Sequence, residues 1–235
     1  VYNMLGDYTA PQADGTVVTV LDGIRQKVSK ETRVLYAKGC AVRDSSRTGF
    51  KDAIETARNA DAVVMVMGGS SARDFSSEYE ETGAAKVTIN QISDMESGEG
   101  YDRATLHLMG RQLELLEEIS RLGKPVVLVL IKGRPLLMEG AIQEAEAIVD
   151  AWYPGMQGGN AVADVLFGDY NPAGRLTLSV PRSVGQLPVY YNTRRKGNRS
   201  RYIEEPGTPR YPFGYGLSYT TFSYTDMKVQ VLSLI

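Results

Sequence analysis

The sequence has few of the residues that build metal centres or disulfide frameworks. Its 235 residues include one cysteine, Cys40, and one histidine, His107. A single cysteine cannot form an internal disulfide, and one cysteine with one histidine is too small a set for a zinc site. We therefore expect no metal and no cofactor. A single cysteine does not indicate whether the protein works in an oxidising or a reducing compartment.

Long apolar runs and an excess of one charge are missing as well. No segment approaches the roughly 20 apolar residues of a membrane-spanning helix, and no signal peptide is evident. The formal net charge is −2 with both signs scattered, so no basic face for nucleic acid or anionic lipid stands out. We expect neither nucleic acid nor membrane as a partner. What remains, 43% hydrophobic and 23% charged residues, is typical of a soluble globular protein.

One stretch, ESGEGYDR at residues 96–103, combines residues that suit chemistry better than packing. Its two glycines indicate a bent loop. A carboxyl group that serves as a general acid at neutral pH needs a raised pKa, which crowded acids and a nearby ring such as that of Tyr101 can provide. Composition alone favours the alternative, a solvated acidic turn.

Hydrophobic spacing divides the chain between residues 16 and 180 into alternating helices and strands. Helices are predicted over 16–29, 49–59, 110–122, 140–146 and 160–167. Strands are predicted over 33–37, 62–67, 125–131, 147–152 and 176–180. The continuous apolar run at 62–67 predicts a strand buried on both faces.

This alternation predicts an α/β fold with a mostly parallel open sheet and helices on both faces. Ligands of such folds bind at the carboxyl ends of the strands. The irregular segment 69–105 leaves the carboxyl end of the strand predicted at 62–67, and it holds two acidic clusters, 78–81 and 96–103. Loops of this length in a compact domain are usually functional or disordered, so the second cluster falls where chemistry is expected.

Other motifs point to function less strongly. The glycine pair at 68–69 lacks the spacing of phosphate-binding loops, which disfavours a nucleotide-binding domain. His107 lies between two leucines, as a half-exposed strand residue would, and no Gly-x-Ser-x-Gly elbow supports a serine-hydrolase triad. Trp152 is expected in the core of a strand. The basic run at 194–196 is expected to be a solvated loop.

Three blocks carry a more specific signal: SGEGYDR at 97–103, AWYPGMQGGNAVADVLFGDYNPAGRL at 151–176 and PFGYGLSYTTF at 212–222. They resemble the carboxyl-terminal half of glycoside hydrolase family 3, a family that contains exo-acting β-glucosidases and β-xylosidases. The resemblance extends over nearly the whole chain. It implies an α/β sandwich domain whose protruding loop brings an acid/base glutamate to an aspartate nucleophile on a separate β/α barrel.

The resemblance also assigns candidate roles. The acid/base position maps onto the acidic stretch, where Glu99 is favoured and Glu96 is the alternative, and Asp102 and Arg103 are expected to pair and fix the loop. Retention needs two carboxyl groups about 5–5.5 Å apart. Arg73 and Phe75 follow the strand predicted at 62–67, in a segment that borders the substrate cleft of family members. They are candidate contacts for sugar or aglycone, with core packing the alternative for Phe75.

The chain departs from the family pattern at both ends. No barrel, and so no nucleophile, is present, the first sandwich strand is missing, and residues 219–235 resemble a linker toward a fibronectin-III-like domain. We expect an internal fragment, with a sandwich domain at 1–181, an extension at 182–235 and any targeting segment upstream of Val1. Its substrate would be a β-glycoside or oligosaccharide, with a glucoside preferred to a xyloside. The fragment alone should be inactive, and a noncatalytic carbohydrate-binding domain is the alternative.

Overall fold

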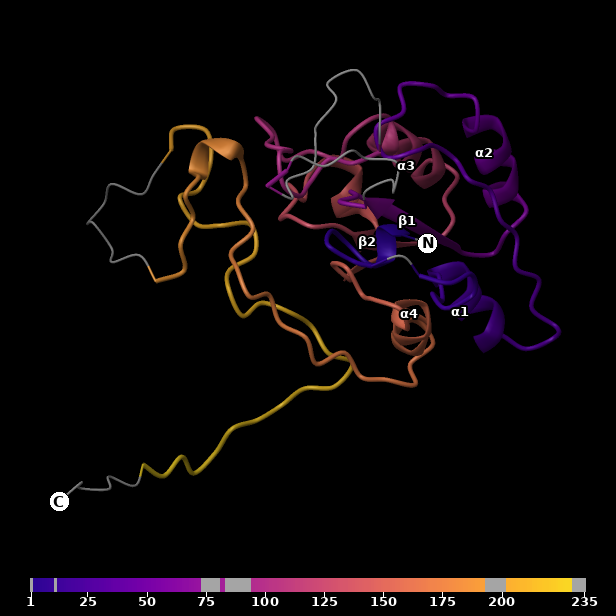
Figure 1. The fold of residues 1–235 in the computed structure, drawn as a ribbon. Coiled ribbons are helices and arrows are strands. Elements are labelled where there is room, and N and C mark those ends of the chain that lie inside the picture. Colours follow the sequence, from indigo (N-terminus) through magenta and orange to yellow (C-terminus); the bar gives the residue numbers. More distant parts are fainter. Residues whose placement is uncertain (1, 11, 73–80, 83–93, 193–201, 230–235) are drawn as a thin grey trace.

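A computed structural model of the protein describes residues 2–10, 12–72, 81–82, 94–192 and 202–229 (Figure 1). Its centre is a parallel sheet in the order β1 (Val63–Gly68), β2 (Val126–Ile131), β3 (Ala147–Asp150). Val63 pairs with Val126, and Val127 pairs with Ala147. Since β2 is the central strand and almost wholly buried, the sheet is built around it.

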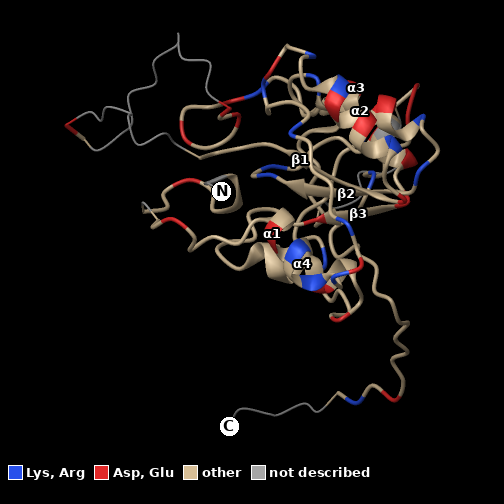
Figure 2. Cartoon of the chain, turned by 90° about the vertical axis from the view of Figure 1, so that its right-hand side faces the viewer, with Lys and Arg blue, Asp and Glu red and all other residues tan. Residues whose placement is uncertain are grey.

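Helices cover both faces of the sheet, as Figures 1 and 2 show. One face packs against α2 (Phe50–Arg58), α3 (Gln112–Ser120) and the 3-10 helix η2 (Gly140–Glu144). The opposite face packs against α1 (Val20–Lys27) and α4 (Gly158–Leu166). Alternate residues of β2 enter the two layers, which is the two-residue period of a strand. The predicted α/β fold with a parallel open sheet is confirmed, and the sheet formed by the described residues does not close into a barrel.

The first helix shows why the sequence folds this way locally. Thr19 is its N-cap: the Thr19 hydroxyl accepts a hydrogen bond from the amide of Asp22, while the Asp22 carboxylate accepts one from the amide of Thr19. This reciprocal capping box satisfies two amides that the first turn would leave open. Hydrogen bonding to Thr19 also lowers the pKa of Asp22. Helix α1 therefore begins at Val20, later than the apolar spacing from residue 16 predicted.

Two of the five predicted strands are wrong. Residues 33–37 run alongside the domain without ladder partners, and the described residues pair β1 only with β2. Residues 176–180 form one isolated antiparallel bridge, Val180 with Tyr211, because proline and glycine in the partner segment interrupt a longer ladder. A third error concerns burial: Val64 and Val66 of β1 are 37% and 49% exposed, so this strand is not buried on both faces.

The chain after α4 returns once to the core, where Val180 is fully buried and Leu176, Leu178 and Tyr211 pack against the cluster. Its carboxyl-terminal end then runs away from the layers (Figure 1). Side-chain hydrogen bonds hold part of this segment together, including Asn171 to Thr220 and Arg175 to Ser218. Its aromatic rings are largely exposed, and Tyr191 stacks on Phe213 with ring centroids 4.1 Å apart. The division into a domain at 1–181 and an extension at 182–235 stays a prediction.

Candidate active site

The acidic stretch forms a tight turn with Glu99 at its tip. The amide of Tyr101 donates a hydrogen bond of 3.2 Å to the carbonyl of Gly98, which closes a four-residue turn. Gly100, the third residue, has φ of +80°, the left-handed value that a type II turn requires at this position. Because the turn points outward, the side chain of Glu99 is exposed.

The base of this turn is tied to the carboxyl ends of β1 and β3. The carbonyl of Ser70, two residues beyond β1, accepts hydrogen bonds from the amides of Glu96 at 2.8 Å and Ser97 at 3.2 Å. The hydroxyl of Ser97 lies 2.9 Å from that of Tyr153, which follows β3. The turn thus stands on the edge of the sheet where open α/β folds bind their ligands.

A third tie comes from the carboxyl end of the central strand. Arg134 follows β2, and its Nη2 donates to the carbonyl of Glu96 at 3.0 Å and to that of Tyr101 at 2.8 Å. These two carbonyls lie on either side of Glu99 in the sequence: Glu96 is two residues before the turn, and Tyr101 is the last residue of the turn. One guanidinium nitrogen therefore joins both ends of the loop that carries Glu99.

Glu96 itself faces inward. Its side chain is 1% exposed, and its Oε2 lies 2.6 Å from Nη1 of Arg103 and 3.6 Å from Nε of Arg134. The other carboxylate oxygen lies against Gly69, where a Cβ atom would be 1.9 Å away. Arg103 also donates to the carbonyl of His107 at 2.5 Å. Glu96 thus anchors the loop through a buried ion pair.

The exposed carboxylate of Glu99 accepts a hydrogen bond from the hydroxyl of Tyr8. Tyr8 has a left-handed backbone, with φ of +59°. Asp7 lies on the same side of the turn, since a Cβ on Gly98 would come within 2.8 Å of its carboxylate. Sequence reasoning missed this neighbourhood, because nothing in a polar loop 91 residues earlier indicates which turn it will contact.

Residues 1–219 match the family model described as "Glycosyl hydrolase family 3 C-terminal domain". The chain belongs to glycoside hydrolase family 3.

Two curated relatives have the same two activities in their names. A "Beta-xylosidase" of Formosa agariphila is 42% identical over 99% of this chain and 29% of its own length. A "Periplasmic beta-glucosidase" of Salmonella typhimurium is 38% identical over 97% of this chain and 31% of its own length. The crystal structure of a β-glucosidase from Listeria innocua in complex with isofagomine aligns with a TM-score of 0.74 and 31% identity, over 95% of this chain and 29% of that one. The chain thus spans under a third of the length of these family 3 relatives.

One contact that was expected within the loop of this family 3 chain is not formed. Asp102 and Arg103 were expected to pair, and this is wrong: Arg103 binds Glu96, while the Asp102 side chain is exposed. Adjacent side chains in an extended segment point in opposite directions, so one of the two faces the core and the other faces solvent. Two candidate residues for this family 3 site, Arg73 and Phe75, lie outside the described residues, as does most of the cluster 78–81.

A second charged group lies beneath this edge of the sheet, and sequence reasoning missed it. Lys132, directly after β2, is fully buried, with its Nζ 2.8 Å from Oδ1 of Asp150 and 3.8 Å from the ring centroid of Trp152. Burial lowers the pKa of Lys132, and the carboxylate of Asp150 opposes that shift. Trp152 lies beyond β3 with φ of +53° and is half-buried, so it covers the lysine rather than filling a strand core as expected.

His107 is exposed between the buried Leu106 and Leu108, so the predicted alternation is confirmed, although the segment is irregular and not a strand. Its Nδ1 lies 2.6 Å from Oε1 of Glu139. Among the described residues no group of three His, Cys, Asp or Glu is arranged to hold a metal ion, and no helix is long and apolar enough to cross a membrane.

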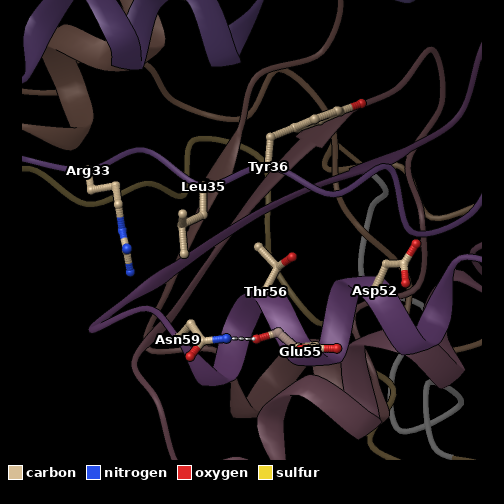
Figure 3. A pocket seen from close by; sticks show the side chains of 7 residues that line it. All are labelled: Arg33, Leu35, Tyr36, Asp52, Glu55, Thr56 and Asn59. Atoms are coloured by element: carbon tan, nitrogen blue, oxygen red, sulfur yellow. Dashed lines mark hydrogen bonds between the residues drawn. The ribbon is translucent and has the colours of Figure 1, made fainter.

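The family 3 domain also has an open groove between the extended segment Arg33–Tyr36 and α2, on which Figure 3 looks down. Charged and polar side chains of α2, including Asp52 and Glu55, line one wall. No residue of the Glu99 turn borders this groove. Charges of both signs are interspersed on α2 and α3 (Figure 2), so this side offers no face of a single sign.

Proposed function

We propose that this family 3 domain supplies the general acid/base of a retaining exo-β-glycosidase, and that Glu99 is the residue. Glu99 would protonate the glycosidic oxygen as the bond to the anomeric carbon breaks, and would then take a proton from the water that hydrolyses the glycosyl-enzyme. β-Glucosides are the first choice of substrate and β-xylosides the second. Relatives named for both activities align over nearly the whole chain.

The contrast between the two glutamates carries this assignment. A proton donor must reach a substrate, and Glu99 is exposed at the tip of a turn at the ligand-binding edge of the sheet. Glu96 is 1% exposed, and its carboxylate is engaged by Arg103. Moving it to a substrate would break a buried ion pair, which costs about 3–5 kcal/mol. Glu96 therefore suits an anchoring role.

The nucleophile in this proposal is a carboxylate of a β/α barrel elsewhere in the protein. Retaining hydrolysis needs two carboxyl groups about 5–5.5 Å apart, and positioning both accounts for much of the rate enhancement. The 235-residue fragment is therefore expected to be inactive by itself. Arg73 and Phe75 keep their proposed contacts with sugar or aglycone.

The test compares Glu99→Gln with the wild type in the full-length protein, using nitrophenyl and alkyl β-glucosides and β-xylosides. Glutamine keeps the size and polarity of the side chain but cannot donate a proton as an acid. We expect kcat/KM for alkyl glycosides to fall by about 10²–10⁴-fold, with a much smaller loss for dinitrophenyl glycosides, whose leaving groups need no protonation. Azide, which attacks the glycosyl-enzyme without base assistance, should restore turnover of the activated substrates.

Glu96→Gln is the matched control, since it removes the neighbouring carboxylate. It should lower stability and reduce turnover of both substrate classes alike. A Glu99→Gln enzyme with wild-type turnover of both substrate classes would refute the assignment. If only Glu96→Gln loses more activity on alkyl than on dinitrophenyl glycosides, Glu96 is the acid/base residue. If neither the wild type nor Glu99→Gln hydrolyses these glycosides but both still bind sugar, a noncatalytic carbohydrate-binding domain is favoured.

A further inference from the structure

We propose that Arg134 is a positioning residue: it holds the loop on both sides of Glu99, at Glu96 and at Tyr101, and so fixes the position of the Glu99 carboxyl group. This inference rests on the proposed acid/base role of Glu99 and goes beyond it. The chemistry would depend on a guanidinium group that touches neither the substrate nor the Glu99 side chain.

The clamp consists of two hydrogen bonds from a single nitrogen. Nη2 of Arg134 donates to the carbonyls of Glu96, at 3.0 Å, and Tyr101, at 2.8 Å. Tyr101 directly follows the segment Gly98–Gly100, and Glu96 precedes it with Ser97 between them. Hydrogen bonds from a charged donor are stronger than those from a neutral donor. The guanidinium group therefore sets the distance between the carbonyls of Glu96 and Tyr101.

Arg134 is itself held in a rigid setting. It lies three residues beyond β2, the central strand, and follows Lys132, whose side chain is fully buried. Its Nε lies 3.6 Å from the buried carboxylate of Glu96. A Cβ on the intervening Gly133 would come within 2.4 Å of the Tyr153 hydroxyl, so the backbone here is packed directly against residues that support the loop. Because the sheet holds Arg134 in place, the guanidinium group fixes the position of the turn relative to the sheet.

The turn needs such external support because its own sequence provides little stiffness. Gly98 and Gly100, on either side of Glu99, both have positive φ, and glycine restricts its backbone less than any other residue. A proton donor displaced by about 1 Å can lose about 10²-fold in rate. Removing the clamp should therefore impair proton donation, while the nucleophile and the sugar-binding residues remain in place.

The experiment measures kcat/KM of the full-length Arg134→Met protein on an alkyl β-glycoside and on the corresponding dinitrophenyl β-glycoside. We expect a loss of about 10–10²-fold on the alkyl substrate and less than about threefold on the activated one. Arg134→Lys keeps the charge and can still reach one carbonyl, so it should recover part of the loss. Arg182→Met is the matched control, because Arg182 likewise donates to a backbone carbonyl, that of Thr208, within the segment that follows α4. It should leave both substrates near wild type.

Introducing Glu99→Gln into the Arg134→Met protein separates this inference from the proposed function. If Arg134 acts through Glu99, the double variant should be no slower on the alkyl substrate than Glu99→Gln alone. Equal losses on both substrates, or additive losses in the double variant, would show a merely structural role and overturn the inference while the role of Glu99 stands. If Glu99→Gln lowers kcat/KM equally on the alkyl and the dinitrophenyl substrate, the proposed function fails, and the positioning role of Arg134 fails with it.

Discussion

At the scale of single residues, the carboxylate of Glu96 occupies the space that a side chain at Gly69 would need, just beyond the end of β1. A Cβ atom on Gly69 would lie 1.9 Å from Oε1 of Glu96, so any side chain there must push the carboxylate aside. Glu96 cannot move freely, since Arg103 binds its other oxygen at 2.6 Å. The absence of a side chain at position 69 is thus what allows the buried ion pair beneath the Glu99 turn.

Gly69→Ala is therefore expected to lower the free energy of unfolding by about 1–3 kcal/mol, the usual cost of overpacking a buried site. Urea denaturation measures this. In Gly174→Ala, the control, the new methyl group meets nothing within 4 Å, so stability should hardly change. The cost should shrink when Glu96 is also replaced by alanine, because the clash is gone; an undiminished cost would contradict this account.

Lys132 and Asp150 form a second buried ion pair among the described residues. Lys132→Met alone leaves the Asp150 carboxylate without its cation and should cost about 3–5 kcal/mol. Asp150→Asn, added to Lys132→Met, should recover most of that loss. Urea denaturation of the two variants and of Asp150→Asn alone checks both statements, and equal stability of Lys132→Met and wild type would refute them.

The pair also predicts a pH dependence. Burial lowers the pKa of Lys132 below its ordinary 10.5, so the unfolded chain binds more protons than the folded one as the pH approaches 10.5 from below. The wild type should therefore gain stability over this range as the pH rises. A protein with both Lys132→Met and Asp150→Asn lacks that gain, so its stability relative to wild type should decline over the same range. Denaturation curves at several alkaline pH values measure the difference, and a constant difference would contradict the prediction.

Sequence reasoning reached part of this site. The glycines around Glu99 indicated a bent loop, and the alternation of strands and helices placed that loop at the carboxyl edge of the sheet. The partners of Arg134 and Lys132 could not be predicted, because each contact joins segments whose approach depends on the three-dimensional fold. Composition could not separate Arg103 bound to Glu96 from the expected pairing with Asp102.

At the scale of secondary-structure elements, α1 and α4 pack backbone against backbone. A Cβ on Gly23 would lie 2.1 Å from the carbonyl oxygen of Gly159, and one on Gly159 would lie 2.0 Å from that of Thr19. At their ends, Lys27 binds Asp164 and Asp169. Hydrogen bonds to these two carboxylates raise the pKa of Lys27. The helix pair thus combines a contact that only glycine allows with an exposed ion-pair cluster.

Gly23→Ala tests which of two opposed effects is larger. Alanine is favoured over glycine within a helix by about 1 kcal/mol, but here its methyl group meets backbone atoms that cannot rotate away. We expect a net loss of about 2 kcal/mol or more in the free energy of unfolding, because α1 must shift off α4. Gly185→Ala, whose methyl group would approach only the hydroxyl of Ser183 at 3.5 Å, should be near neutral. A stabilised Gly23→Ala protein would show that helix propensity dominates.

The elements also show where periodicity fails as a predictor. Apolar spacing located all four α-helices of the described residues, because each buries one stripe against the sheet. For strands, an apolar run is necessary but not sufficient, since a strand also needs a partner for its ladder. Residues 33–37 are apolar enough, yet they lie outside the ladder in the described structure.

At the scale of the whole molecule, the sheet is asymmetric. The central strand, β2, is covered on both faces, whereas β1 leaves Val64 and Val66 exposed by 37% and 49%. Both valines lie on one side of the strand, since side chains alternate along it. Within the described residues β1 pairs only with β2, so its other edge carries backbone amides and carbonyls outside the ladder. An apolar strip beside such an edge is a template for association.

The 235-residue chain, purified by itself, is therefore expected to self-associate through β1 in a concentration-dependent manner. Val66→Lys places a charge on the exposed strip and should shift the chain toward monomer, as charges on natural edge strands do. Val229→Lys is the matched control: that valine is 74% exposed, but it lies in the carboxyl-terminal segment, away from the sheet. Light scattering over a range of concentrations measures the mass. If wild type and Val66→Lys are both monomeric throughout, or if Val229→Lys prevents association equally well, the β1 strip is not the contact between chains.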